Sequence, residues 1–220
     1  MKVVWLSHVL APDTPLYGGG DKVGFTHPRS MARGDSCNTT LLGLSSHAGT
    51  HVDVPRHFLP AGGAVEHYPP ETWLFHSPLL IEISVPPGEL IRPEDVTPKL
   101  PLDQPIDILL VKTGFSLRRQ EEIYWRQGPG LSPALGEYLK NGISGLRAVG
   151  VDFLSVSSLA RREEGREAHR ALLEREILIF EDLALGNLQP KERLTKIIAL
   201  PLRFQGGDGA PCSVLGWVEG

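Results

Sequence analysis

His47-Ala48-Gly49-Thr50-His51-Val52-Asp53-Val54-Pro55-Arg56-His57 carries the strongest chemical signal in this sequence of 220 residues. Three of the eight histidines of the chain fall within this segment, together with one carboxylate, Asp53. Imidazole and carboxylate groups are ligands that zinc, manganese and iron accept in proteins, so the pattern indicates a metal site. The structural alternative is a histidine-rich surface strand whose side chains are satisfied by ordinary hydrogen bonds.

The spacing within the segment also constrains its backbone. The four polar side chains at positions 47, 51, 53 and 57 are odd-numbered, so an extended chain would present them on one face. Gly49, the β-branched residues and Pro55 all disfavour a helix. A straight strand would nevertheless separate His47 from His51 by about 13 Å, too far to share one ion. We therefore expect the chain to bend at Gly49, the residue with the greatest conformational freedom.

The remaining sequence predicts more strands than helices. Compact apolar runs predict strands at 3–6, 39–46, 79–85, 106–113, 148–152, 177–180, 197–200 and 213–218. A helix is predicted at 132–141, where Ser132-Pro133 supplies a start and Asn141-Gly142 a stop, and a second within 163–176. Regular strand–helix alternation is rare, which indicates an α/β fold with a substantial sheet.

Composition excludes several classes of partner. The 22 Lys and Arg against 26 Asp and Glu give a net charge of −4, which supplies no basic footprint for nucleic acid or an anionic membrane. Neither a signal peptide nor a membrane-spanning run is predicted, so we expect a cytoplasmic protein. Cys37 and Cys212 are expected to be two independent reduced thiols.

The pattern H-x-G-T-H-x-D-x-P-x-H is complete over residues 47–57 and resembles the signature of the cyclase-like metal-dependent hydrolases. That family includes bacterial kynurenine formamidase and isatin hydrolase. Further similarity lies in the N-terminal loop up to Gly20-Asp21, at 150–152 and at 207–211, so the resemblance spans nearly the whole chain. It implies one swivelling β/β/α-type domain with a mixed, strand-rich sheet over residues 1–220, assembled as a homodimer or homotetramer.

The same resemblance implies a ligand set. The family has a distal histidine followed twelve residues later by a glutamate, and here His169 and Glu181 have that separation. These two residues would join His47, His51 and Asp53 around one or two divalent ions per subunit, with zinc expected and manganese as the alternative. With two ions, Asp53 and Glu181 would bridge them, because a carboxylate has two oxygens to offer.

The implied activity is hydrolysis of a small non-peptide amide. A metal-bound hydroxide would attack the carbonyl carbon, and His57, left unligated, would shuttle the proton to the departing nitrogen. The expected substrate is an aryl formamide such as N-formylkynurenine, an intermediate of tryptophan catabolism, or a cyclic amide. Tyr17 stands where bacterial kynurenine formamidases have a substrate-packing tryptophan. The alternatives are a lactone or cyclic-imide hydrolase, and a catalytically silent metal-binding protein on the same scaffold.

Overall fold

Nine strands among the described residues form one mixed sheet at the centre of the molecule. The computed structural model describes residues 1–20, 22–101, 104–189 and 192–219, so Asp21 of the N-terminal resemblance lies outside them. The strands are β1 (Lys2–Trp5), β4 (His51–Asp53), β5 (Leu74–Phe75), β6 (Pro78–Glu82), β8 (Ile108–Lys112), β10 (Ala148–Val151), β11 (Leu178–Glu181), β12 (Arg193–Pro201) and β13 (Gly209–Glu219). Their order is β5-β12-β13-β4-β11-β10-β8-β6, with β1 paired to β13. The predicted α/β fold with a strand-rich mixed sheet is confirmed.

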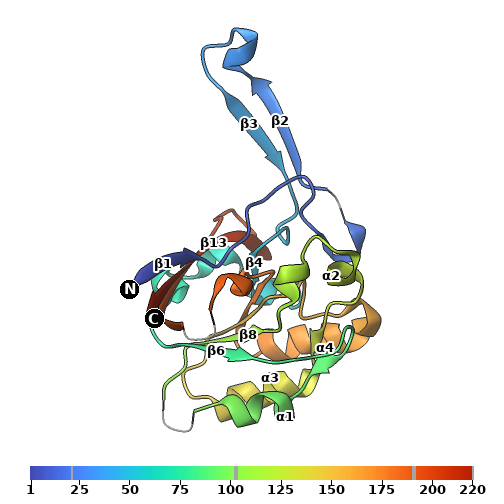
Figure 1. The fold of residues 1–220 in the computed structure, drawn as a ribbon, viewed down its shortest axis with the longest axis vertical. Coiled ribbons are helices and arrows are strands. Elements are labelled where there is room, and N and C mark those ends of the chain that lie inside the picture. Colours follow the sequence, from blue (N-terminus) through green and yellow to red (C-terminus); the bar gives the residue numbers. More distant parts are fainter. Residues whose placement is uncertain (21, 102–103, 190–191, 220) are drawn as a thin grey trace.

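One half of this sheet is parallel and covered by helices. β6, β8, β10 and β11 pair in parallel, and all four residues of β10 and of β11 are buried, as continuous apolar runs predict. The helices are α1 (Pro93–Val96), α2 (Glu122–Arg126), α3 (Pro133–Gly142) and α4 (Arg162–Leu173). α3 packs against α4 (Figure 1), and α4 also contacts β11. The larger apolar core lies between these helices and the sheet.

Both predicted long helices are present within a few residues of their expected bounds. α3 begins at Pro133, directly after Ser132, as the Ser-Pro pair predicts. α4 covers 162–173 rather than reaching 176, because the chain turns there toward β11. Glu176 has a φ of 55°, a left-handed conformation that a helix interior does not accept.

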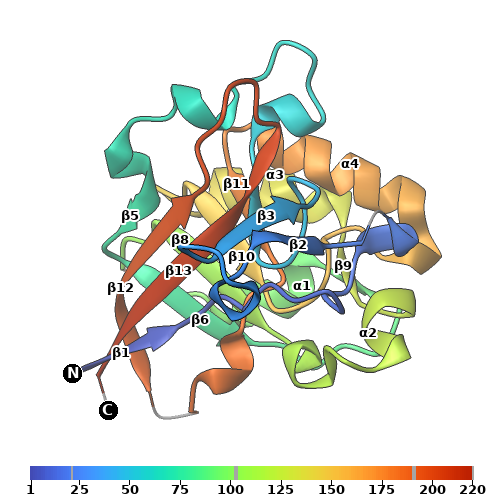
Figure 2. The ribbon, with the colours of Figure 1, turned by 90° about the horizontal axis from the view of Figure 1, so that it is seen from above.

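The other half of the sheet is antiparallel. β12 and β13 form a long hairpin whose strands run side by side in Figure 2. The strands predicted at 197–200 and 213–218 lie inside it but are too short, because buried and less buried residues alternate along β13 and apolar runs mark only part of such a strand. β4 pairs with both β13 and β11, so the histidine-rich segment lies where the two halves of the sheet meet.

A second hairpin projects from the body of the molecule. β2 (Gly24–Arg29) and β3 (Thr39–Gly43) form this projecting arm (Figure 1). The strand expected at 39–46 ends at Gly43, and β2 was missed because its sequence, GFTHPR, contains Pro28 and no apolar run. A further short parallel pair joins β7 (Leu90–Ile91) to β9 (Gly130–Leu131). Among the described residues no helix is long and apolar enough to cross a bilayer, and the longest, α4, has 12 residues.

Candidate metal centre

The histidine-rich segment bends at Gly49 as its spacing predicts. Gly49 has a φ of 67°, and a β-carbon there would lie 2.7 Å from Leu10 Cδ2, so both backbone and space favour glycine. The bend brings the ring centroids of His47 and His51 to within 5.2 Å of each other. Residues 51–53 then form β4, and a 3₁₀ turn over Pro55–His57 follows. The two histidines can therefore face one site.

Strand register and one helix complete the cluster. His51 of β4 lies opposite Glu181 of antiparallel β11, and its Nε2 is 3.3 Å from Glu181 Oε2. His169, on α4, has its Nε2 3.3 Å from Glu181 Oε1 and 3.4 Å from Asp53 Oδ2. His47 Nδ1 lies 2.8 Å from Asp53 Oδ1. All five residues that the resemblance implies as ligands therefore lie together.

Backbone carbonyls fix the orientation of two imidazoles. His51 Nδ1–H donates to Gly49 O at 2.7 Å, and His169 Nδ1–H donates to Gly165 O at 2.8 Å. In each neutral ring this leaves the lone pair on Nε2, the atom that faces the carboxylates. Metal-binding histidines are held in this way, with the second ring nitrogen donating to a carbonyl or carboxylate.

Asp53 supplies the strongest sign that the cluster suits a cation. Its side chain is 1% exposed, and its Oδ2 accepts no hydrogen bond from any described residue. A buried carboxylate oxygen without a donor is costly unless a positive charge lies beside it. The neighbouring groups that could bind a metal are imidazole nitrogens and the Glu181 carboxylate. Zinc, manganese and ferrous iron all accept this set of ligands. The residues present therefore fit a divalent ion.

The charges of the cluster depend on one another. Burial lowers the pKa of His169, but Asp53 and Glu181 outweigh burial and raise that pKa to about 10. Burial and Asp53 raise the pKa of Glu181, but His169 and His51 bring it down to about 2. The same histidine contacts overcome burial to hold the pKa of Asp53 well below its usual range. Protons and a cation thus compete for the same imidazole lone pairs.

His57 lies beside the cluster, and an acidic residue that was not predicted holds it there. Its ring stacks on His47 at a centroid distance of 3.9 Å, and its Nδ1 is 3.2 Å from Asp208 Oδ2. The same Oδ2 lies 2.9 Å from His47 Nε2, and Asp208 Oδ1 accepts a hydrogen bond from Ser46. Asp208 precedes β13 in the segment 207–211, whose family resemblance was noted without a role for its carboxylate. Side-chain atoms of His47, Asp53 and His57 that could bind a metal also lie within 4.8 Å of one another. The geometry therefore also allows His57 to be a metal ligand.

A cavity of about 300 Å³ opens onto the cluster. Phe58 forms part of its wall, and its ring stacks on that of His169 at 4.5 Å. Tyr17, which is 38% exposed, also lines this cavity, and its predicted contact with substrate stays a prediction. Two arginines of α4, Arg162 and Arg166, line the same cavity and were not predicted as site residues.

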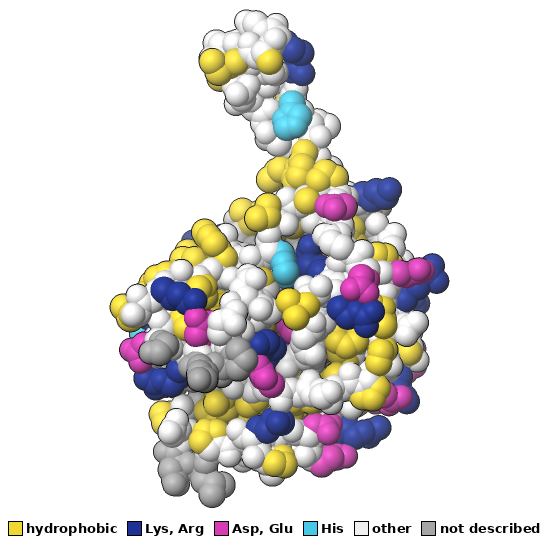
Figure 3. Space-filling view, viewed as in Figure 1, with side chains coloured by type: hydrophobic (Ala, Val, Ile, Leu, Met, Phe, Trp, Pro, Cys, Tyr) yellow, Lys and Arg dark blue, Asp and Glu magenta, His cyan; other side chains and the backbone are white. Residues whose placement is uncertain are grey.

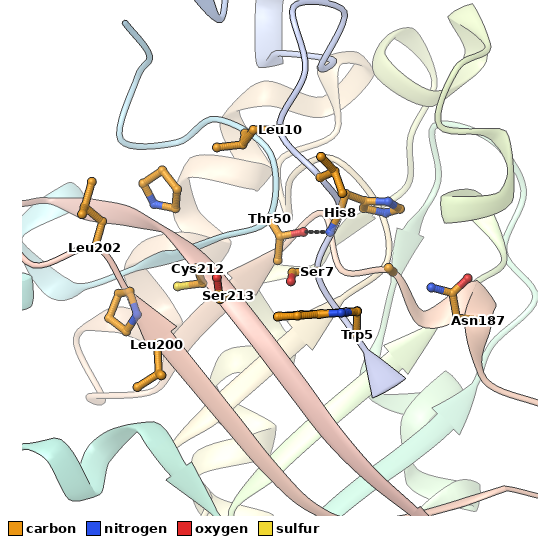
Figure 4. A pocket seen from close by; sticks show the side chains of 14 residues that line it. Trp5, Ser7, His8, Leu10, Thr50, Asn187, Leu200, Leu202, Cys212 and Ser213 are labelled. Atoms are coloured by element: carbon orange, nitrogen blue, oxygen red, sulfur yellow. Dashed lines mark hydrogen bonds between the residues drawn. The ribbon is translucent and has the colours of Figure 1, made fainter. Parts of the chain in front are cut away.

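A larger cavity of about 820 Å³ lies apart from this cluster. Figure 4 shows it between Trp5 and His8 near the N-terminus and Leu200 and Leu202 on the β12–β13 hairpin. The backbone N–H of His8 donates to Thr50 Oγ1 at 2.9 Å on its wall. Its wall combines apolar side chains such as Trp5 and Leu200 with the hydroxyl groups of Ser7 and Ser213.

Comparison with known proteins agrees with this geometry. Residues 4–158 match the model of the Cyclase family, described as "Putative cyclase". A kynurenine formamidase of Salinibacter ruber is 30% identical over 218 residues, covering 96% of this chain and 95% of that protein. Cyclase-like protein 2 of Oryza sativa subsp. japonica is 29% identical over 221 residues, covering 96% of this chain and 77% of that protein.

A solved structure shares the fold. An isatin hydrolase bound to the product analogue thioisatinate superposes with a TM-score of 0.83 at 20% identity, covering 99% of this chain and 92% of that chain. The family match includes the whole segment 47–57 and extends over most of the sequence. The chain therefore belongs to the cyclase family, as the histidine motif predicted.

Proposed function

We propose that this protein is a metal-dependent hydrolase of a small non-peptide amide, with an aryl formamide such as N-formylkynurenine as substrate. The observation that carries the proposal is the buried cluster around Asp53, whose Oδ2 lacks a hydrogen-bond donor among the described residues. The similarity to a kynurenine formamidase over nearly the full length of both proteins supports the aryl formamide.

His47, His51, Asp53, His169 and Glu181 would hold the metal, one or two ions, with zinc expected and manganese as the alternative. A divalent ion supplies Lewis-acid polarisation of a carbonyl oxygen and lowers the pKa of a water that it holds. Asp53 and Glu181 each present two oxygens toward the histidine nitrogens, so they are the residues able to bridge two ions. No serine nucleophile is needed for this chemistry.

His57 is the proposed proton carrier. Donation from its Nδ1–H to Asp208 would fix the tautomer in which Nε2 carries a lone pair. That nitrogen can accept a proton from the attacking water and then donate it to the nitrogen of the breaking C–N bond. The Asp208 carboxylate, 3.2 Å away, would stabilise the transient imidazolium.

The direct test is turnover before and after chelation. Metal-loaded protein should hydrolyse N-formylkynurenine or formanilide, lose activity with a chelator, and regain it with zinc or manganese. Isatin and a lactone serve as competing substrates, and a preference for either would replace the aryl formamide proposal. Stoichiometric metal with no turnover on any of these compounds would favour a silent metal-binding protein, and activity that survives complete metal removal would exclude the metal mechanism.

Two variants separate the roles within the cluster. Asp53→Ala should lose metal and activity together, because it removes the carboxylate that three histidines face. His57→Ala should keep its metal and lose turnover by about 10²- to 10⁴-fold, the usual contribution of a general acid–base. Elemental analysis measures metal content and a rate assay measures turnover for each variant. If His57→Ala contains no metal, His57 is a ligand and not the proton carrier.

A further inference from the structure

Helix α4 carries a stripe of three side chains that all line the catalytic cavity. Arg162, Arg166 and His169 are spaced i, i+4 and i+7, so they lie on one face of the helix. At 1.5 Å per residue, Arg166 lies about 4.5 Å and Arg162 about 10 Å along the axis from His169. The stripe thus runs from the buried His169 to the exposed Arg166 and Arg162.

Within the described part of the chain, neither Arg162 nor Arg166 makes a buried ion pair that would explain its presence by a contribution to the stability of the fold. No carboxylate among the described residues pairs with Arg162, whereas its neighbour Arg161 pairs with both Glu89 and Glu164. Arg162 is also the first residue of α4, where the helix dipole disfavours a positive charge. Arg166 contacts Glu163 at 2.8 Å, but that pair is largely exposed and contributes little.

The rest of the cavity indicates what occupies the space between the arginines and the cluster. Phe58, Leu154 and Tyr17 supply apolar and aromatic walls, and a volume of about 300 Å³ suits a compound with a single ring. Gly165 determines how closely α4 packs on Ser157, which also lines this cavity. A β-carbon at Gly165 would lie only 1.9 Å from Ser157 Oγ. The two arginines therefore line the same cavity as the metal-facing residues, about one and two helical turns along α4 from His169.

We propose that Arg162 and Arg166 bind a carboxylate of the substrate, carried by a part of the molecule that is remote from the amide that is cleaved. Guanidinium groups pair with carboxylates through charge-assisted hydrogen bonds, which suits them to this position. The proposal rests on the amide hydrolase function and narrows its substrate class to anionic aryl amides. Arg162 and Arg166 are specificity residues in this reaction and take no part in bond cleavage.

The test compares 4-formamidobenzoate with its neutral isostere 4-formamidobenzamide on the metal-loaded enzyme. We expect kcat/KM to be at least about tenfold higher for the carboxylate, and Arg162→Gln and Arg166→Gln each to lower that advantage several-fold. The double variant should abolish the advantage through KM while leaving kcat/KM for the benzamide within about twofold. Arg170→Gln is a matched change at an exposed arginine of α4 that does not line the cavity. It should change kcat/KM for neither substrate.

The failure of this proposal is distinguishable from failure of the hydrolase function. Equal kcat/KM for the two compounds, or equal loss of both in the double variant, would overturn the carboxylate site while leaving amide hydrolysis intact. If neither compound is hydrolysed, calorimetric binding of 4-aminobenzoate against 4-aminobenzamide decides the matter. Preferential binding of the acid that is lost in the double variant supports the anion site, and equal binding of the two compounds overturns it.

Discussion

Asp208 joins the two histidines that have different proposed tasks. Its Oδ2 lies 2.9 Å from His47 Nε2 and 3.2 Å from His57 Nδ1, so one carboxylate orients both a metal ligand and the proton carrier. A carboxylate that accepts a hydrogen bond from the other ring nitrogen of a metal-binding histidine fixes the orientation of that ring and raises its basicity. The sequence of residues 207–211 does not predict this role, because Asp208 is 161 positions from His47 and the pairing of β13 with β4 brings the two together.

Replacing Asp208 by Asn should weaken metal binding about 10- to 100-fold, the usual effect of losing such a partner. At saturating metal, kcat should also fall, because His57 loses its orientation and the support for its positive charge. The double variant Asp208→Asn/His57→Ala should then be no slower than His57→Ala alone. If the two losses instead multiply in kcat, Asp208 acts independently of His57.

The raised pKa of His169 makes metal affinity depend on pH. The value rises from 6.5 to about 10 because Asp53 and Glu181 outweigh burial. The protonated ring stabilises the metal-free fold fully below pH 6.5, and this contribution is lost as the pH rises through about 10. Zinc must displace the proton from Nε2, so affinity should rise by about tenfold per pH unit for each displaced proton in this window. Chelator competition across several pH values measures this slope, and an affinity that stays constant would contradict the assignment of His169 as a ligand.

At the scale of elements, α4 depends on the absence of a side chain at Gly165. The helix packs on Ser157 there, and a β-carbon would lie 2.5 Å from Ser157 Cα, which is backbone and cannot move aside cheaply. Gly165 also supplies the carbonyl that orients His169. The close approach therefore sets the position of His169, a proposed metal ligand, as well as the packing of the helix.

Gly165→Ala should destabilise the protein by about 2 kcal/mol, as overpacking of a filled site does. For a chain of this size that corresponds to a fall in melting temperature of about 4–8 °C. Metal affinity should fall as well, because His169 moves with the helix. Gly142→Ala is the matched control at the end of α3, where the nearest atom lies 3.8 Å away, and it should be neutral or slightly stabilising. Equal melting temperatures for the two variants would contradict the packing argument.

How well each element could be predicted depends on how local its signal is. β10, β11 and α3 were predicted closely, because buried runs and a Ser-Pro start are properties of adjacent residues. β2 carries no such signal, since it is held by its partner β3 alone. Likewise, His169 and Glu181, the proposed distal ligands, were identified by family resemblance. Arg162 and Arg166 belong to no motif, and their place in the cavity is evident only from the position of α4.

At the scale of the whole molecule, two exposed apolar surfaces remain. The β2–β3 arm extends from the body, with apolar side chains visible at its tip and near its base (Figure 3), and Leu41 and Leu42 are 64% and 56% exposed. The 820 Å³ cavity has Trp5 and Leu202 at its edge, 60% and 61% exposed. An isolated two-stranded hairpin is marginally stable in water, so a partner surface for the arm is expected.

We propose that the arm contributes to a homodimer or homotetramer. Leu41→Asp combined with Leu42→Asp should lower the molar mass in solution toward that of one chain, as measured by light scattering after size-exclusion chromatography. Leu117→Asp replaces a side chain that is 74% exposed on the body of the molecule and should leave the mass unchanged. A wild-type protein of 24.1 kDa in solution, or an unchanged mass in the arm variant, would contradict this assembly.

The five metal-facing side chains come from two stretches, 47–53 and 169–181, with β5, β6, β8 and β10 between them in the chain. During synthesis, only the first stretch exists while most of the polypeptide is still unmade. A nascent chain that has reached residue 53 therefore offers two imidazoles and one carboxylate, which is an incomplete set of the proposed ligands. The complete set of proposed ligands therefore forms only once α4 and β11 have folded against β4.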